Sequence, residues 1–306
     1  MTSNPVTFST LACPEWTVDT VIARAAAFGY DGLEWRGGDQ GHVSPAWTAA
    51  ERQSLRRRVE QAGLASMAVT AYSRFVSPDS AERAAQLDHL RRHLDLAADL
   101  GARYVRTFIG NLPPGRSRAE ATPAIVDCLR AAAEHAAQAG LIVAAESHDD
   151  WVRSSAVAAV VEAVDHPALR VLWDFGNAFG AGEDPAEGLA RLKALLGYVH
   201  VKDGVRSAAG WRLTRFGEGN VPLPQIMHDL VAAGYQGPLC VEWERAWHPE
   251  LDPAETALPE ALAAMRGWLA DLSPRTPSLN GKGEQESAGS SLRSVGGRGE
   301  QEQRQL

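Results

Sequence analysis

The sequence predicts a single (β/α)₈ barrel, an α/β fold, over residues 1–272, followed by a disordered tail over 273–306. Eight apolar, β-branched runs alternate with eight helical patterns along residues 6–270. Strict alternation of strands and helices is typical of parallel strands joined by right-handed crossovers. Eight such units fit a closed barrel, which typically needs about 250 residues. An open doubly wound sheet is disfavoured because no glycine-rich phosphate turn follows the first strand.

The expected strands are 6–13, 30–36, 64–70, 104–110, 141–147, 169–176, 198–203 and 238–244. The expected helices, rich in Ala, Leu, Arg and Glu, lie around 17–28, 49–61, 79–100, 118–139, 154–164, 185–196, 222–233 and 254–270. Several of these helices end in a glycine directly before the next strand, a residue that adopts the left-handed conformation closing a helix. The longest connection, 204–221, is expected to be a loop and a candidate lid over the site.

The composition is 45% hydrophobic and 22% charged, which is typical of a globular protein with a sizeable core. The formal charge of −8 disfavours nucleic acid as a partner and is compatible with a metal site. Residues 273–306 are rich in Gly, Ser, Gln and Glu and lack aromatic residues, so we expect them to be disordered.

The cysteines and the N-terminal residues bear on the cellular compartment. The three cysteines are widely spaced and predict no disulfide framework. The sequence has no apolar run of ~20 residues, and its first residues do not resemble a signal peptide. We therefore expect a cytoplasmic protein without a membrane partner; whether it forms a homo-oligomer is left open.

Ionisable residues stand in apolar runs at the ends of the last four strands. They are Glu146, Asp174, His200 and Glu242. Barrel closure brings these strand ends together, where crowded carboxylates would repel one another without a cation. Oxygen-rich ligands with one imidazole favour one divalent metal ion, Mn²⁺ first and Mg²⁺, Co²⁺ or Zn²⁺ as alternatives. Separate ion pairs with Arg106, Lys202 and Arg206 are the competing interpretation.

These residues resemble the xylose isomerase-like TIM barrels, a superfamily of sugar phosphate isomerases and epimerases. The order Glu, Asp, His, Glu is similar to that family's metal ligands, and the stretches 200–203 (HVKD) and 217–222 (GEGNVP) are similar to its signatures. The resemblance covers residues 6 to about 270. It implies that Arg206 lies near the substrate oxygens, whereas Asn177 departs from the histidine often found at its position.

The chemistry indicated is proton abstraction next to a carbonyl of a ketose, keto-sugar or related polyol, through a metal-stabilised enediolate. Glu146 and Glu242 are the candidate catalytic acid and base. Epimerisation, isomerisation and dehydration of a keto-cyclitol or keto-glycoside all remain open. We expect an unphosphorylated carbohydrate, because the loop after the last strand has no glycine-rich phosphate cradle.

Further residues at the strand ends are candidates for binding the substrate. They are Trp16, Glu34, Arg36, His148, Asn177, Lys202 and Arg206. A Glu34–Arg36 ion pair in the barrel mouth is an alternative interpretation. Tryptophans at or past strand ends could form apolar walls for a sugar, namely Trp16, Trp35, Trp151, Trp211 and Trp247.

Two other functional classes are alternatives for the same barrel. A DNA-repair endonuclease would need additional histidines, but position 177 is Asn and residues 204–221 contain no histidine. A non-catalytic barrel subunit is disfavoured because the four candidate ligands are all present.

Overall fold

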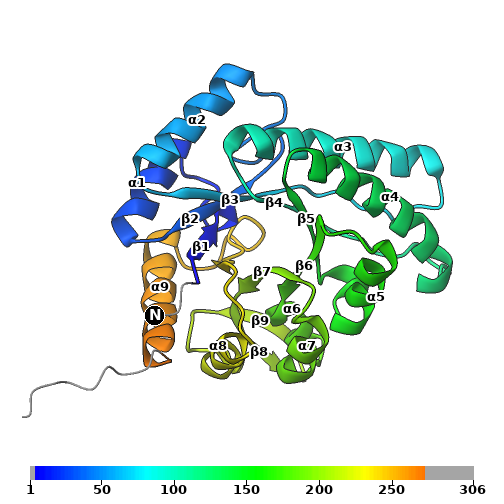
Figure 1. The fold of residues 1–306 in the computed structure, drawn as a ribbon. Helices are drawn as coiled ribbons and strands as arrows, with labels where there is room; N and C mark the ends of the chain where they lie inside the picture. Colours follow the sequence, from blue (N-terminus) through cyan, green and yellow to red (C-terminus); the bar gives the residue numbers. More distant parts are fainter. Residues whose placement is uncertain (1–3, 273–306) are drawn as a thin grey trace, which may run out of the picture. The chain divides into compact units, whose positions relative to one another are not determined.

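The computed structural model describes residues 4–272. The predicted tail, 273–306, lies outside the described residues. Eight parallel strands close into a barrel in the order β1-β10-β7-β6-β5-β4-β3-β2, which confirms the predicted fold (Figure 1). The barrel strands are β1 (Val6–Ser9), β2 (Gly32–Arg36), β3 (Ala65–Thr70), β4 (Tyr104–Thr107), β5 (Ile142–Glu146), β6 (Leu169–Asp174), β7 (Leu196–Val201) and β10 (Leu239–Val241). They are buried on both faces, as parallel strands covered by helices must be.

The helices surround the barrel and match the predicted positions closely. They are α1 (Val18–Phe28), α2 (Ala49–Gln61), α3 (Ser80–Leu100), α4 (Arg118–Gln138), α5 (Ser154–Val164), α6 (Phe175–Gly180), α7 (Pro185–Leu192), α8 (Leu223–Ala232) and α9 (Ala254–Asp271). Capping boxes at Thr48 and Ser117 begin α2 and α4. Left-handed Gly29 and Gly101 end α1 and α3, as the glycine pattern predicts.

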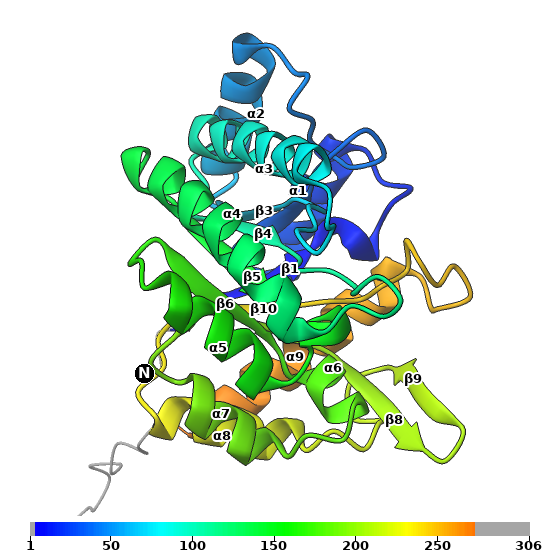
Figure 2. The same ribbon diagram turned by 90° about the vertical axis from the view of Figure 1, so that its right-hand side faces the viewer.

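The segment after β7 corrects one expectation. Residues 204–221 were expected to be a loop, but they contain most of an antiparallel hairpin of β8 (Asp203–Ser207) and β9 (Gly210–Thr214). Figure 2 shows the hairpin projecting beside the barrel. The turn that follows is held by Asp203, whose Oδ2 accepts hydrogen bonds from the backbone N–H groups of Gly217 and Gly219. A Cβ at position 219 would lie 1.9 Å from Asp203 Oδ1, so this close approach requires glycine.

Several barrel strands are shorter than expected, since each predicted run continues past the last ladder residue. The first strand ends at Ser9, and a 3₁₀ turn, Thr10–Ala12, follows it. The strand expected at 104–110 ends at Thr107. The carboxyl ends of the strands therefore lead directly into short segments that shape the barrel mouth.

The barrel interior beneath the mouth is filled by one compact cluster from six neighbouring strands. Its buried members are Met67, Ala68, Tyr104, Ala144, Leu172, Tyr198 and Cys240. A larger core of apolar side chains joins the outer face of the strands to the helices. The interior cluster closes the barrel from below, so a ligand can enter the described barrel interior from the mouth but cannot pass through it.

The barrel closes where the first and last strands meet. Phe8 of β1 pairs with Leu33 of β2 on one side and with Val241 of β10 on the other. The Asn4 side-chain amide donates hydrogen bonds to the carbonyls of Tyr235 and Gly237. The two ends of the sheet are thus fastened by both ladder pairing and a side-chain clamp.

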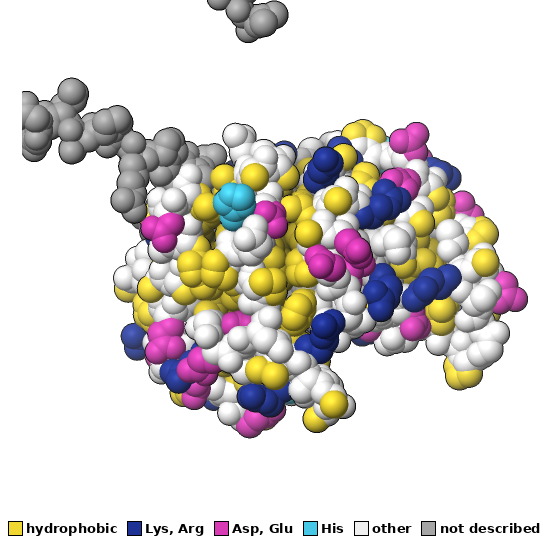
Figure 3. Space-filling model, turned by 90° about the horizontal axis from the view of Figure 1, so that it is seen from below, with side chains coloured by type: hydrophobic (Ala, Val, Ile, Leu, Met, Phe, Trp, Pro, Cys, Tyr) yellow, Lys and Arg dark blue, Asp and Glu magenta, His cyan; other side chains and the backbone are white. Residues whose placement is uncertain are grey.

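The surface shows mixed charge on the face seen in Figure 3, where Lys and Arg side chains alternate with Asp and Glu. Among the described residues, none of the helices combines the length and the apolar character needed to span a bilayer.

Candidate active site

Four ionisable side chains meet at the carboxyl ends of β5, β6, β7 and β10. They are Glu146, Asp174, His200 and Glu242, and one ligand atom from each lies within 4.8 Å of every other. All four are buried. Strand register explains part of this convergence, since Asp174 pairs with His200, and His200 pairs with Cys240, two residues before Glu242. The structure thus brings together all four residues predicted to be metal ligands.

Lys202 and Asn177 hold the carboxylates on one side of this cluster. Lys202 Nζ lies 2.8 Å from Asp174 Oδ2 and 2.7 Å from Glu242 Oε2, and it also contacts Glu244. Asn177 Nδ2 donates to Asp174 Oδ2 at 2.7 Å, and the Asn177 backbone N–H donates to Oδ1. Both residues were predicted to bind substrate, but their polar groups are directed at the cluster itself.

Arg106 holds the opposite side. Its guanidinium contacts Glu146, lies 4.0 Å from Glu242 Oε1 and is stacked against the rings of Phe108 and Tyr72. The residue is 3% exposed. The glutamates raise the pKa of Arg106 although burial opposes its charge. The aromatic faces and the glutamates therefore fix a permanent positive charge beside the two candidate catalytic residues.

The pKa values of Asp174 and Glu242 are shifted in opposite directions. Burial, together with the neighbouring Glu242 and Glu146, raises the pKa of Asp174 to about 7 although Lys202 opposes this shift. The pKa of Glu242 is well below its usual range, because His200 and Lys202 outweigh the effect of burial. Burial is the largest cause of the raised pKa of Asp174, and the two neighbouring carboxylates add to it.

The donor set fits a divalent cation. Glu146 Oε1 is buried and has no hydrogen-bond partner among the described residues, whereas Glu146 Oε2 contacts Arg106. His200 Nδ1 faces Glu242 Oε1 at 3.2 Å and Glu146 Oε1 at 3.9 Å. Buried carboxylate oxygens around one imidazole nitrogen are the ligands expected for a hard or borderline divalent metal.

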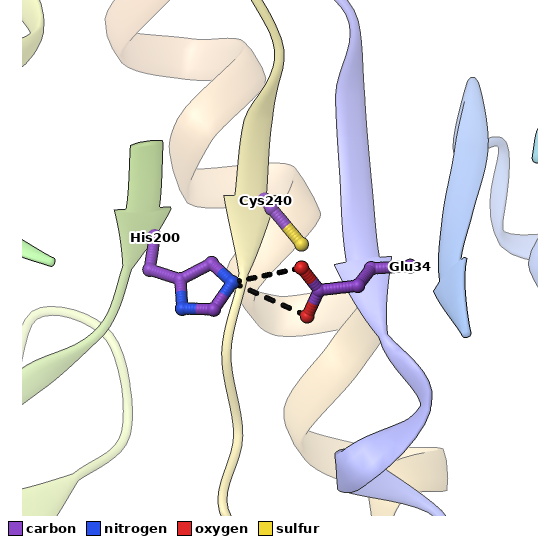
Figure 4. A group of neighbouring side chains, drawn as sticks. All are labelled: Glu34, His200 and Cys240. Carbon is purple, nitrogen blue, oxygen red and sulfur yellow. Dashed lines mark hydrogen bonds and ion pairs between the residues drawn. The ribbon is translucent and has the colours of Figure 1, made fainter. Parts of the chain in front are cut away.

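Glu34 faces His200, and Figure 4 shows its carboxylate directed at the imidazole ring. Its carboxylate lies 3.1 and 3.2 Å from His200 Nε2 and also accepts a hydrogen bond from the Tyr198 hydroxyl. Glu34 is fully buried. The alternative of a Glu34–Arg36 ion pair is corrected, because the Glu34 carboxylate is directed at His200 and Tyr198, where it can orient the imidazole. This role requires the barrel register, which the sequence pattern does not provide. Contact of Glu34 with substrate stays a prediction.

A pocket of about 490 Å³ opens directly above the cluster. Its lining consists of Leu11, Tyr72, Arg74, Arg106, Phe108, Glu146, His148, Glu242, Glu244 and Trp247. His148 is within this lining, and hydrogen bonding to Asp149 raises its pKa although burial opposes that shift. Tyr72 and Phe108 were not predicted, although Phe108 comes directly after β4 and Tyr72 comes two residues after β3.

Two other candidates, Trp16 and Arg206, lie away from this pocket. Trp16 is buried, and its Nε1 donates to Glu255 on α9. Arg206, on β8, donates to the carbonyl of Phe179 and does not line the pocket. The expected position of Arg206 near substrate oxygens is thus not seen in this arrangement. Trp247 alone of the five predicted tryptophans lines the pocket; the others are Trp16, Trp35, Trp151 and Trp211.

Comparison with known proteins agrees with this geometry. The family model of the xylose isomerase-like TIM barrel matches residues 22–268. The chain belongs to this family. The L-ribulose-5-phosphate 3-epimerase of Escherichia coli (strain K12) is 28% identical over 233 residues, which cover 73% of this chain and 78% of that protein.

Two solved structures show the same fold. An L-ribulose 3-epimerase has a TM-score of 0.75 at 18% identity and covers 88% of this chain and 95% of its own. A xylose isomerase-like TIM barrel protein from Mycobacterium smegmatis, in complex with magnesium, has a TM-score of 0.68 at 18% identity, covering 89% of this chain and 98% of its own.

Proposed function

We propose that this family member is a divalent-metal-dependent isomerase or epimerase of a ketose, keto-sugar or related polyol. The observation that carries the proposal is the buried cluster of Glu146, Asp174, His200 and Glu242 at the base of an open pocket. The sequence relative from E. coli is a sugar 3-epimerase, which supports the same reaction class. Mn²⁺ is the metal we propose first, because three carboxylates and one imidazole suit it; Mg²⁺, Co²⁺ and Zn²⁺ are the alternatives.

Glu146 and Glu242 perform the proton transfers in this proposal. Both line the pocket, and they come from β5 and β10, which are not neighbours in the barrel. They can therefore reach a bound sugar from different directions. One carboxylate removes the proton next to the carbonyl, and the other returns a proton to the opposite face, which inverts the centre. Return of the proton to the neighbouring carbon would give isomerisation instead.

The surrounding residues position these carboxylates. Arg106 contacts Glu146, and Lys202 contacts Glu242, so each glutamate is oriented by its own cation. A bound divalent ion would add Lewis-acid polarisation of the substrate carbonyl. Tyr72, Phe108 and Trp247 supply apolar walls that exclude water from the base of the pocket.

The cysteines bear on the compartment, and the absence of a histidine at position 177 and in the hairpin bears on the DNA-repair alternative. All three cysteines are free, which is the state expected in the reducing cytoplasm, and we propose that compartment. The described residues offer no histidine at position 177 or in the hairpin that could extend the cluster to further metal ions. This supports action on a small carbohydrate rather than on nucleic acid.

The test combines metal analysis with solvent exchange. The purified protein is assayed for bound metal, reloaded with each of the four ions, and incubated in D₂O with ketoses, keto-cyclitols and 3-keto-glycosides. We expect one ion per chain and NMR-detected deuterium at the carbon next to the carbonyl of one substrate class. Loss of water from the substrate would instead identify the dehydratase alternative.

Glu146→Gln, checked for retained metal, is expected to lower exchange by roughly 10²- to 10⁴-fold. Glu60→Gln, on the exposed face of α2, is the matched control and should leave exchange unchanged. A protein holding three zinc ions, or one in which Glu146→Gln exchanges normally, contradicts the proposal.

A further inference from the structure

Arg36, the last residue of β2, is a largely buried residue whose guanidinium has no anionic partner among the described residues, although its nitrogens are not fully enclosed. The residue is 7% exposed. Among residues 4–272 its side chain forms no ion pair with a carboxylate and donates no hydrogen bond to another residue. A buried charge is normally paired, because removing it from water is unfavourable. The guanidinium therefore has hydrogen-bonding capacity that the described protein does not use.

The geometry of β2 places Arg36 near the barrel mouth. Side chains two residues apart on a strand share one face. Arg36 thus lies on the same inner face as Glu34, about 7 Å further toward the mouth. It contacts Trp247, which lines the pocket, but it is not itself one of the lining residues.

The backbone of Arg36 is held firmly while its side chain is free. The Arg36 N–H donates to Thr10 Oγ1 at 2.8 Å, and its carbonyl accepts from the N–H groups of His42 and Val43. A fixed backbone reduces the entropy lost when the side chain binds a ligand.

Trp247 covers one face of the guanidinium. The Arg36 Cζ lies 4.6 Å from the centroid of the Trp247 ring. That ring packs edge-on against Tyr72, and both aromatic residues line the pocket. Stacking occupies the face of a guanidinium but leaves its N–H edges available for hydrogen bonds in the plane. The stack thus places a donor edge beside the pocket wall.

The other cations around the pocket already have partners. Arg106 is paired with Glu146 and approaches Glu242. Arg74 lies 3.8 Å from Asp149. Unlike these two arginines, Arg36 has no carboxylate partner among residues 4–272.

We propose that Arg36 binds an anionic group, a carboxylate or a phosphate, at the end of the sugar remote from its carbonyl. This inference rests on the proposed function, because it assumes that the carbonyl end lies against the four-residue cluster. It differs from the expectation of an unphosphorylated sugar, which considered only the loop after the last strand. A single guanidinium can bind either anion in a bidentate manner without a glycine-rich loop.

The test compares three ligands that share one ketose head. D-Fructose is neutral, D-fructuronate carries a terminal carboxylate, and D-fructose 6-phosphate carries a terminal phosphate. Dissociation constants for the metal-loaded protein are measured by calorimetry, so the result does not depend on turnover. We expect at least one anionic ligand to bind roughly ten- to a hundredfold more tightly than fructose, as a charge-assisted hydrogen bond permits. The stronger anion identifies the group.

Arg36→Met should abolish that preference while leaving the affinity for fructose unchanged, and Arg36→Lys should retain part of it. Arg103→Met is the matched control, since Arg103 also lies over an aromatic ring, Tyr104, at the opposite end of the barrel. Equal losses for all three ligands in Arg36→Met would reduce Arg36 to a packing role and overturn the inference. So would an anion preference that survives in Arg36→Met.

Failure of the proposed function has a different signature. In that case the ligands show no deuterium exchange, although an anion preference that depends on Arg36 can still be measured. If the parent protein shows no anion preference but normal exchange on a neutral sugar, only the role of Arg36 is rejected.

Discussion

The first and second halves of the barrel present side chains of opposite charge at the same mouth. Strands β2 to β4 and the segments after them contribute Arg36, Arg74 and Arg106 with aromatic neighbours. Strands β5 to β10 contribute the carboxylates and His200. A ligand that spans the mouth therefore meets a site suited to a cation and a carbonyl on one side, and guanidinium groups on the other. The two halves of one barrel thus present groups of different charge to a ligand at the mouth.

The largest expected effect comes from removing the charge of Arg106, the arginine of the first half that contacts carboxylates of the second half. Arg106→Met leaves Glu146 and Glu242 without their nearest cation from the first half, and we expect the metal-free protein to lose about 3–5 kcal/mol of unfolding free energy. Chemical denaturation measures this loss. Arg106→Lys keeps the charge but not the planar stack and should lose less. An unchanged stability in Arg106→Met would show that the halves are not electrostatically coupled.

Two buried histidines extend the comparison, because their pKa values are shifted in opposite directions. In the second half, Glu242 and Glu34 raise the pKa of His200 although burial opposes the shift. On α3, behind the first half, burial lowers the pKa of His93 to about 4. Between pH 6.5 and about 4 the unfolded chain binds a proton at His93 that the folded chain does not. The unfolding free energy should therefore fall as pH decreases through this window, by roughly 3 kcal/mol from His93 alone.

His93→Gln is the variant that isolates this contribution. Its denaturation midpoint should depend less on pH than that of the parent between pH 6.5 and 4, and the two proteins should have parallel profiles above pH 7. Parallel profiles across the whole range would contradict a neutral buried His93.

Two residues depart from the charge division: Lys202 is a cation of the second half, and Glu34 is an acid of the first half. A change at Glu34 has the smallest expected effect. Glu34→Gln weakens the hydrogen bond that orients His200. We expect the metal affinity to fall by roughly 10- to 100-fold. Competition with a fluorescent chelator measures it without reference to activity. Tyr198→Phe, which removes only the other hydrogen bond to Glu34, should change the affinity less. Equal affinities in Glu34→Gln and the parent protein would indicate that the register of β7 alone orients His200.

The sequence predicted the barrel well because both strand runs and helix ends have local signals. Apolar runs and left-handed glycines such as Gly29 mark boundaries that need no tertiary information. Glu146 and Asp174 were identifiable because an ionisable group at the end of an apolar strand is unusual. Their convergence then follows from barrel closure.

The remaining features depend on contacts between distant residues. Trp16 donates to Glu255, 239 positions away, and no local pattern indicates that it faces α9 instead of the pocket. The alternation of β2 puts Glu34 and Arg36 on one face, but the layer that each reaches is set by strand stagger. The β8–β9 hairpin is short and exposed in part, so its apolar pattern is weaker than that of a buried strand.

The pairing of β1 with β10 has a consequence for synthesis on the ribosome. Val6–Ser9 cannot complete its pairing until Leu239–Val241 has been made. At typical elongation rates of about 5–20 residues per second, the first strand lacks one neighbour for on the order of ten seconds or more. Glu242 follows the last strand directly, so the nascent chain completes its four-residue cluster only when the barrel closes. Any ion that this cluster binds can therefore be captured only after Glu242 has been made.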